Sequence, residues 1–374
     1  MKEQLLNYLA CPGCGSELNL EILDKAAVEI KDGIFVCPNC GNYYFLIEYI
    51  PRFLPVDVIK RSDYWANFAG KYRERLAKLD IPLSQNETNF IEEDDYEIRL
   101  RTIEYFGYEW KKFMNWGWLE EDDITRKDRI KYTGGFISNT ASAFKTKSLM
   151  NGDDLAKGKL ILDAGCGNGR FTNQAAEYGA EVIGTDIGTG AVEAAYQNTR
   201  ERDNIHIIQG DLFKLPFKKK VFDTAFSIGV LMHTGDAYQA FKSITSHIKV
   251  GGVLTTHVYQ KLNPIWEVND SVLRKITTNM SIESNLKFAN FMSKLGRLLS
   301  RMKVLNVANL FIRVQPTLIH MYDWYSAPVA THHTYDEVKN WYVENDFEIF
   351  MTNETDSFNL IKSWGLTVKG KRCR

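Results

Sequence analysis

The chain has 374 residues and a mass of 43.0 kDa, which is enough for two or three domains. Lys and Arg number 46 against 47 Asp and Glu, so the formal net charge is −1 and the chain lacks the basic excess of a general nucleic-acid-binding protein. No apolar run approaches the roughly 18 residues of a membrane span, and the first residues lack a signal-peptide pattern. We therefore expect a soluble cytoplasmic protein.

Four of the six cysteines form two Cys-x-x-Cys pairs within the first 40 residues, separated by 22 residues. This spacing is close to that of four-cysteine zinc sites, and the glycine after each pair lets the backbone turn its amides toward the sulfurs. Two disulfides or a thioredoxin-like motif are alternatives, but the chain shows neither a secretion signal nor a strand and helix around a redox motif. We predict a zinc ribbon over residues 1–58 and a structural Zn²⁺ bound by Cys11, Cys14, Cys37 and Cys40.

The segments LACPGCGSEL and GIFVCPNCGNYYFLIEYIPRFLP, within residues 5–55, resemble the Trm112-type zinc ribbon in cysteine spacing and in their hydrophobic tail. Members of that family stabilise methyltransferases by covering an apolar edge of the catalytic domain, and they do no chemistry themselves. The resemblance implies a scaffold role. The charge agrees, because residues 1–60 hold 5 Lys and Arg against 8 Asp and Glu, and an acidic ribbon is poorly suited to RNA.

Residues 59–158 show a polar helical pattern rich in aromatic side chains, and we expect a helical collar there. The collar either packs against the next domain or closes over a bound ligand, together with a turn at Gly134-Gly135-Phe136. The sequence leaves both roles open. The rings are Tyr105, Phe106, Tyr108, Trp110, Phe113, Trp116 and Trp118.

A strand, a glycine turn and a helix follow one another from residue 159. KLILDA predicts a buried parallel strand, GCGNG follows it, and TNQAAEYGA is helical, which is the first unit of a Rossmann-like sheet. The spacing differs from the dinucleotide fingerprint GxGxxG because Arg170 takes the place of the last glycine. An acid at Asp163 would repel a pyrophosphate and attract an ammonium or sulfonium group.

Further predicted strands end in acids. Residues 181–186 end at Asp186, which can accept both hydroxyls of a ribose, and the next strand leads to Asp211, within reach of an adenine amino group. Later strands are expected over residues 222–229, 251–258, 347–352 and 358–370, with a helix opened by a capping box at Thr334.

Over roughly residues 159–260 these motifs resemble the class I S-adenosylmethionine-dependent methyltransferases. The resemblance implies an α/β fold with a Rossmann-like seven-stranded sheet in the order 3-2-1-4-5-7-6, strand 7 antiparallel, built from residues 159–261 and 321–374. It implies S-adenosyl-L-methionine as cofactor. The implied contacts are Asp163, Gly165 and Gly167 around the methionine part, Asp186 on the ribose, Asp211 near the adenine, and the backbone of Ser227 or Ile228.

Residues 262–320 form a predicted insertion. Apolar residues recur there at helical spacing with Lys and Arg on the other face, which predicts a basic amphipathic helix over 284–313 acting as a lid. The segment holds 8 Lys and Arg against 3 Asp and Glu. It either packs as a solvated helix over the sheet edge, attracts an anionic substrate, or contacts a membrane surface or RNA.

Methyl transfer is an in-line displacement, so a base is needed only when the acceptor must lose a proton. The tetrapeptide [ND]PP[FY], which holds planar amines, is absent after the fourth strand, and this disfavours amine acceptors such as adenine N6. His233 on that loop is the first candidate base, with a structural histidine as the alternative. Weaker candidates are His332, His333 and Tyr259.

We expect an enzyme that methylates a hydroxyl of a small-molecule or glycan-linked acceptor, which could be anionic. A first alternative is transfer to tRNA, rRNA or protein, because Trm112-type partners serve such enzymes. A second is a non-catalytic S-adenosylmethionine-binding scaffold, against which the intact acids argue. A closed, ring-lined pocket would favour a small acceptor, and an open groove flanked by Lys and Arg a macromolecule.

Overall fold

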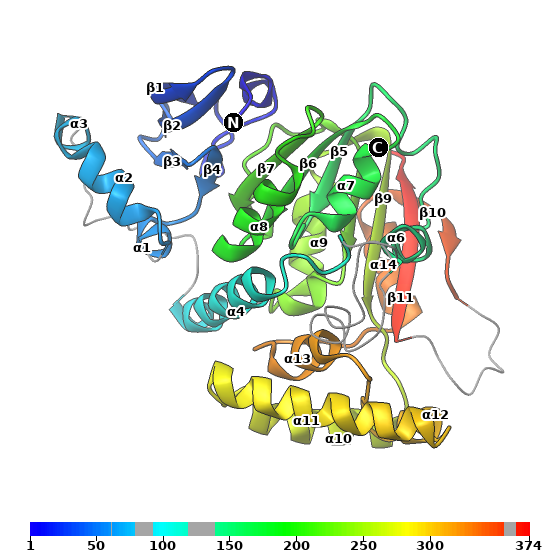
Figure 1. Cartoon of the computed structure of the whole chain (residues 1–374). Coiled ribbons are helices and arrows are strands. Elements are labelled where there is room, and N and C mark those ends of the chain that lie inside the picture. Colours follow the sequence, from blue (N-terminus) through cyan, green and yellow to red (C-terminus); the bar gives the residue numbers. More distant parts are fainter. Residues whose placement is uncertain (61, 79–92, 119–138, 355–363) are drawn as a thin grey trace.

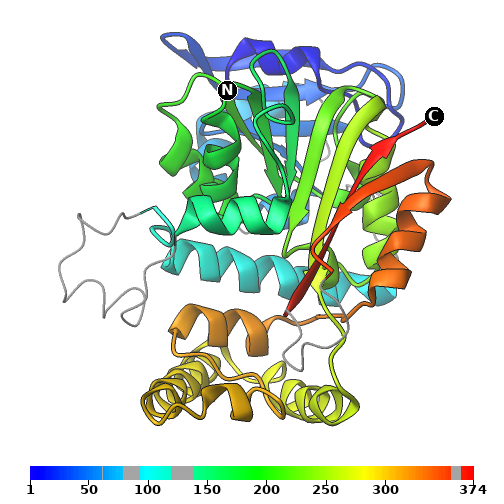
Figure 2. The ribbon, with the colours of Figure 1, turned by 90° about the vertical axis from the view of Figure 1, so that its right-hand side faces the viewer.

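The computed structural model describes residues 1–60, 62–78, 93–118, 139–354 and 364–374. Eleven strands form one mixed sheet, in the order β1-β2-β3-β4-β7-β6-β5-β8-β9-β11-β10 (Figure 1). Helices lie on both of its faces, and a layer of helices closes one end of the molecule (Figures 1 and 2).

The strands from residue 160 onward have the predicted order in the sheet. Its strands are β5 (Leu160–Ala164), β6 (Glu181–Asp186), β7 (Ile205–Gly210), β8 (Phe222–Ile228), β9 (Ile248–Tyr259), β10 (Phe347–Thr352) and β11 (Gly365–Arg372). Numbered along the chain, they run 3-2-1-4-5-7-6, and β11 is antiparallel to both of its neighbours. The predicted last strand began at 358, and its first residues lie outside the described ones.

The strand count differs from the prediction because the ribbon is not a separate unit. It comprises η1 (Glu3–Asn7) and the antiparallel strands β1 (Asn19–Ala26), β2 (Glu29–Val36), β3 (Tyr43–Ile47) and β4 (Ile50–Phe53). Strand β4 pairs in parallel with β7, so the ribbon continues the sheet. Arg52 is fully buried and stabilises this junction, because its guanidinium donates to Gln209 Oε1 at 2.8 Å and pairs with Glu193 at 3.3 Å.

Successive side chains of each strand point to opposite faces of the sheet, and both faces are buried under helices. Helices α6 (Thr140–Ser148), α7 (Arg170–Ala176) and α8 (Thr189–Thr199) cover one face, with Phe144, Phe171 and Val192 packed on Ile161 and Val182. Helices α9 (Ala237–Thr245) and α14 (Tyr335–Glu344) cover the other. The predicted capping box opens α14, and two short 3₁₀ turns, η3 (Leu212–Lys214) and η4 (Leu231–His233), follow the ends of β7 and β8.

Helices of the predicted collar pack against two different parts of the molecule, the ribbon and α8. Helices α1 (Val56–Ile59), α2 (Trp65–Lys71) and α3 (Arg73–Lys78) follow the ribbon, and Phe45 of β3 meets Trp65 at 5.2 Å and Phe68 at 5.7 Å between ring centroids. Helix α4 (Glu93–Lys112) instead crosses α8. The Gly134-Gly135-Phe136 turn lies outside the described residues.

The insertion contains several helices in place of the predicted single one over 284–313. These are α10 (Pro264–Thr277), α11 (Ile282–Arg301) and α12 (Leu305–Ala308), followed by α13 (Leu318–Ser326). Helix α11 ends because Lys303 adopts a left-handed conformation, with φ of 59°, which an α-helix cannot continue. Across the described parts of the chain, no helix is both long and apolar enough to cross a membrane.

Candidate active site

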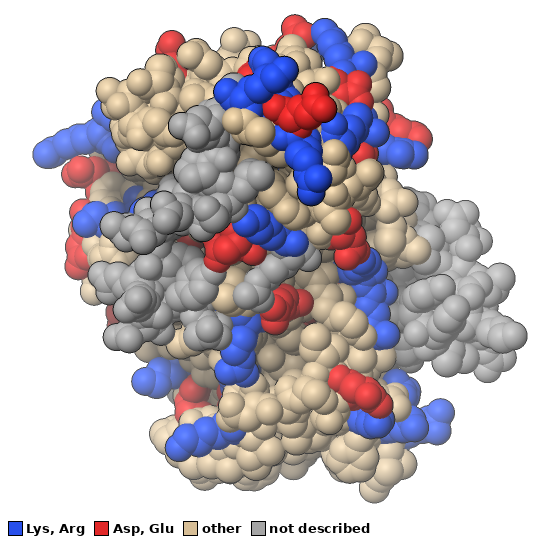
Figure 3. All heavy atoms as spheres, turned by 90° about the vertical axis from the view of Figure 1, so that its left-hand side faces the viewer, with Lys and Arg blue, Asp and Glu red and all other residues tan. Residues whose placement is uncertain are grey.

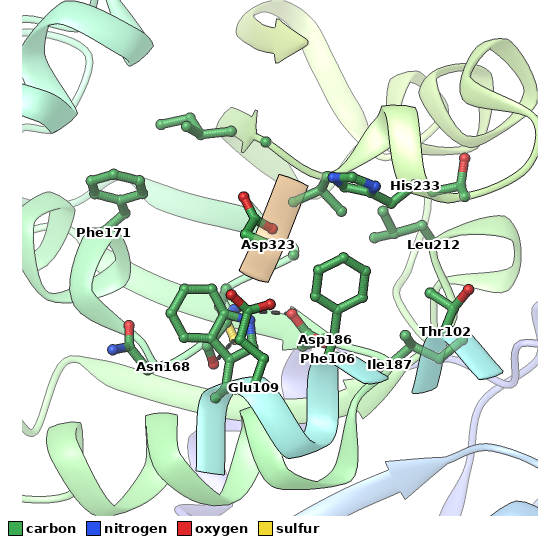
Figure 4. Close-up of a pocket in the computed structure, with 18 of the residues that line it drawn as sticks. Thr102, Phe106, Glu109, Asn168, Phe171, Asp186, Ile187, Leu212, His233 and Asp323 are labelled. Atoms are coloured by element: carbon green, nitrogen blue, oxygen red, sulfur yellow. Dashed lines mark hydrogen bonds between the residues drawn. The ribbon is translucent and has the colours of Figure 1, made fainter. Parts of the chain in front are cut away.

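A pocket lies at the carboxyl ends of β5, β6, β7 and β8, between the sheet, α4 and α13 (Figure 4). Ligands of open α/β sheets bind at this edge, where the strand order reverses. The pocket has two chemically different ends: one is built from the glycine turn and the acids that follow β6 and β7, and the other from aromatic and titratable side chains of α4, η4, β9 and α13.

The glycine turn after β5 needs its glycines. Gly165, Gly167 and Gly169 have φ of 97°, 53° and 81°, in the region that side chains rarely adopt. A Cβ on Gly165 would lie 2.2 Å from the side chain of Val230, and one on Gly167 would lie 2.8 Å from Trp110. The backbone of the turn therefore stays bare where it faces the pocket.

Two acids stand at the tips of neighbouring parallel strands. Asp186 accepts the backbone N–H of Gly167 at 3.0 Å with one oxygen and that of Gly188 at 2.9 Å with the other. Burial raises the pKa of this carboxyl above its usual value, and the backbone donors oppose the rise. Asp211 accepts from Arg99 of α4 at 2.7 Å. Both carboxyl groups keep acceptor capacity for a ligand.

Five of the seven predicted cofactor residues line this pocket: Gly165, Gly167, Asp186, Asp211 and Ile228.

The other two predicted cofactor residues lie behind the glycine turn and do not line the pocket. Asp163 is only 2% exposed and accepts a hydrogen bond from the hydroxyl of Thr172 at 2.7 Å, and its burial raises its pKa to about 7. Ser227 donates to the carbonyl of Ala164 at 2.8 Å. Both side chains therefore stabilise the strand and helix that flank the glycine turn.

His233 is held with one ring nitrogen occupied and the other bare. Its Nδ1 lies 2.6 Å from the carbonyl oxygen of Val329, and because a carbonyl only accepts, Nδ1 carries the proton. Its Nε2 is buried and has no hydrogen-bond partner among the described residues. Burial lowers the pKa of His233, so the ring stays neutral at neutral pH with a free lone pair at the pocket wall.

Tyr259 also lines the pocket, whereas the two adjacent histidines do not. The Tyr259 hydroxyl donates to Asp323 at 3.2 Å. His332 Nδ1 meets Glu267 at 2.7 Å, and its ring stacks on Trp324 at 5.7 Å. His333 uses both nitrogens, toward Glu337 at 2.7 Å and Thr331 at 2.8 Å. Neither histidine is among the lining residues, and both tie the loop before α14 to its neighbours.

Sequence reasoning missed an acid pair in the pocket. Glu109 of α4 and Asp323 of α13 both direct their carboxyl groups into it (Figure 4). Glu109 is 1% exposed, and its Oε2 has no hydrogen-bond partner in the part of the chain described. Burial raises the pKa of Glu109 well above its usual value, Asp323 raises it further, and Arg170 opposes the rise. The one sequence signal was the lone acid among the rings of YFGYEW.

The four ribbon cysteines converge as predicted. Their Sγ atoms all lie within 4.8 Å of one another, with Cys11–Cys40 at 3.6 Å and Cys14–Cys37 at 3.5 Å. A tetrahedral zinc with Zn–S bonds of about 2.3 Å separates its sulfurs by roughly 3.8 Å, so the cluster has the dimensions of a metal site. None of the four forms a disulfide.

Comparison with known proteins agrees with this site. Residues 162–256 match the family model described as methyltransferase domain. The ubiquinone biosynthesis O-methyltransferase of Coxiella burnetii is 31% identical over 147 residues, which are 36% of this chain and 63% of that protein. An O-methyltransferase of Penicillium expansum is 36% identical over 103 residues, or 26% and 37% of the two chains.

Among solved structures, magnesium protoporphyrin IX methyltransferase from Synechocystis is 19% identical, with a TM-score of 0.44, covering 74% of this chain and 99% of that one. The chain spans 37% and 63% of the lengths of the two curated relatives. Residues 162–256 therefore form a methyltransferase domain, as the motifs indicated.

Proposed function

We propose that the chain is an S-adenosylmethionine-dependent methyltransferase that acts on a hydroxyl of a small-molecule or glycan-linked acceptor. The observation that carries this proposal is the bare, neutral Nε2 of His233 in the same pocket as Asp186 and Asp211. A base of this kind suits an acceptor that must lose a proton. The two relatives described above are both named O-methyltransferases, which supports an oxygen acceptor.

The residues present fit the cofactor. Asp186 would accept the ribose hydroxyls, Asp211 would face the adenine, and the bare glycine turn would run along the methionine part. S-adenosylmethionine supplies an electrophilic methyl group on its sulfonium. The acids at the ends of β6 and β7, Asp186 and Asp211, suit a ligand that carries positive charge and no pyrophosphate.

The chain's own residues would align the acceptor and take its proton. As the acceptor oxygen gains the methyl group, its proton passes to Nε2 of His233. The Nδ1–H bond to Val329 fixes the ring, and Asp323 stabilises the imidazolium that forms. The rings of Phe106 and Tyr259 pack on His233, with centroids 5.1 and 5.4 Å away, and exclude water from the base.

The lining favours a small acceptor over a macromolecule. Aromatic residues recur around the pocket. Among the described lining residues, three side chains are Lys or Arg, and one of these, Arg99, forms an ion pair with Asp211. The remaining two, Lys147 and Arg170, can attract an anionic group of the acceptor. Burial lowers the pKa of Lys147 to about 8 and that of Arg170 to about 10, so both stay mostly protonated at neutral pH.

We propose a scaffold role for the ribbon, with Zn²⁺ bound by its four cysteines. The site lies in a unit that supplies β4 to the edge of the methyltransferase sheet and lies away from the pocket. Removal of the metal would loosen that edge without removing any pocket residue. Because β4 occupies the β7 edge, this resembles a fused form of the pairing that Trm112-type ribbons make with separate chains.

The test is transfer of a labelled methyl group. The full chain is incubated with labelled S-adenosylmethionine and a cell extract separated into metabolite, RNA and protein fractions. We expect label in the metabolite fraction, lost in His233→Asn and retained in His332→Asn. Label only in RNA or protein would overturn the small-acceptor proposal, and cofactor binding without any transfer would indicate a non-catalytic binding protein.

A further inference from the structure

The helical insertion carries a large apolar surface on its outer side. Its helices α10 and α11 both lie at the end of the molecule farthest from the ribbon (Figures 1 and 2). Each packs its inner face on α13, α10 through Trp266 and Arg274 and α11 through Ala289 and Met292. The opposite faces of both helices are therefore turned away from the core.

Apolar residues gather on those outer faces. On α10, Ile265, Val268, Val272 and Ile276 are spaced by three or four residues, which places them on one face, and each is 55–62% exposed. On α11 and the turn that ends it, Phe291, Leu298 and Met302 are spaced by seven and four residues, which also places them on one face, and they are 53–61% exposed. The surface continues over α12 and its exit with Val307, Leu310 and Phe311. Single exposed apolar residues are ordinary, but aligned stripes on two helices that both pack on α13 are not.

The cations of the insertion border this surface. The exposed ones are Lys275, Lys287, Lys294, Arg301 and Lys303, whereas Glu283 is the exposed carboxylate. Glu283 pairs with Lys287 at 2.7 Å, and no other of these five cations is ion-paired in the structure as described. The lower end of Figure 3, where the insertion lies, is mostly uncharged surface, and both Lys or Arg and Asp or Glu side chains lie around it.

We propose that the outer face of α10–α12 binds the surface of a lipid bilayer that contains anionic lipids. Aliphatic and aromatic side chains on one face of a helix, flanked by Lys and Arg, bury into the interfacial region while the cations meet lipid phosphates. A second copy of this chain fits the face less well. Two-fold pairing would bring the same five cations against one another.

The placement of the face connects it with the pocket. Helix α13 separates the two: it packs on α10 and α11 and presents Ile319, His320 and Asp323 to the pocket. A bilayer bound to the outer face would lie two helix layers, α10–α11 and then α13, from the acceptor end of the site. This location suits acceptors that partition into membranes, although the binding itself does not depend on the chemistry in the pocket.

The experiment is vesicle flotation of the full chain. Vesicles of equal parts phosphatidylglycerol and phosphatidylcholine should carry the protein, and pure phosphatidylcholine should not, with binding that weakens as salt rises. The double variant Val272→Asp/Phe291→Asp should bind anionic vesicles about tenfold or more weakly. Lys294→Glu/Arg301→Glu should weaken binding by about the same factor.

Matched controls are Val343→Asp, an equally exposed apolar residue on α14, and Lys242→Glu, an exposed cation on α9. Both should bind as the parent does, and all variants should show the parent's melting temperature. Equal binding to both vesicle types, no binding to either, or equal losses in the controls would each overturn the proposal. So would a dimer in solution that Val272→Asp/Phe291→Asp dissociates, since the face would then belong to a second copy.

Discussion

Gly107 of α4 and Gly190 of α8 meet backbone to backbone: a Cβ on Gly190 would lie 2.1 Å from the carbonyl oxygen of Gly107. This approach fixes how α4 lies across the sheet, and thereby where Arg99, Glu109 and Trp110 enter the pocket. The pocket wall therefore depends on the absence of a side chain at a position that does not itself line the pocket.

Gly190→Ala should displace α4 and weaken cofactor binding. Backbone cannot yield as a side chain can, so the overpacking costs about 1–3 kcal/mol of unfolding free energy. The measurements are thermal unfolding and the dissociation constant of S-adenosylmethionine. Gly70→Ala, in α2 with open space around its Cα, is the matched control and should stabilise slightly. Equal behaviour of the two variants would contradict the packing argument.

His233→Asn should lower kcat by about 10²–10⁴-fold. In the parent, activity requires the neutral ring, and burial lowers the pKa of His233. The midpoint of the acidic limb of the pH–rate profile should thus lie below pH 6.5, which is the ordinary pKa of histidine. Asp323 partly opposes the shift, so Asp323→Asn should move the limb to still lower pH. A limb unaffected by both substitutions would assign the base elsewhere.

Asp163 should make folding pH-dependent. Burial raises its pKa to about 7 in the folded chain, against about 3.9 when unfolded. The folded state therefore favours the protonated acid, and the associated stability, present below pH 4, is lost as pH rises through 7. Asp163→Asn should be close to the parent in stability at low pH and more stable above pH 7, by an amount on the order of a few kcal/mol.

Urea unfolding at pH 5 and pH 8 measures this difference. Asp153→Asn, at an exposed turn, is the control and should shift stability equally at both pH values. A parent whose stability is unchanged between the two would mean that Asp163 stays ionised.

Zinc removal should loosen the ribbon. The purified chain should contain about one zinc, and a chelator or Cys37→Ser should lower the melting temperature because metal binding is coupled to local folding. S-adenosylmethionine binding should persist, since no pocket residue lies in the ribbon. A zinc-free chain of unchanged stability would refute the scaffold role.

The features that the sequence predicted are those held within short segments. The two Cys-x-x-Cys pairs, the glycine turn and the acid at each strand tip are local patterns, and the structure brings them together as expected. The strand order followed from the family resemblance. It also appears in the pairing of β5 with both β6 and β8.

The features that it did not predict arise from packing between distant segments. Glu109 and Asp323 are 214 residues apart and meet only because α4 and α13 face the same pocket. His233 and His333 look alike in the sequence, but one has a bare nitrogen and the other has two partners. The pairing of β4 with β7 uses backbone groups and leaves no pattern in the side chains.

That pairing also sets the order in which the chain can assemble. Arg52 and Gln209 are 157 residues apart, so the ribbon leaves the ribosome long before the strand that it joins. Its four cysteines come together within one short segment of the chain, whereas the pairing of β4 with the sheet must wait for β7. Contacts of such separation form late and slow folding. During synthesis, the edge of β4 that later joins β7 is consequently open, and the pairing of β4 with β3 is what holds the strand in shape until β7 has been made.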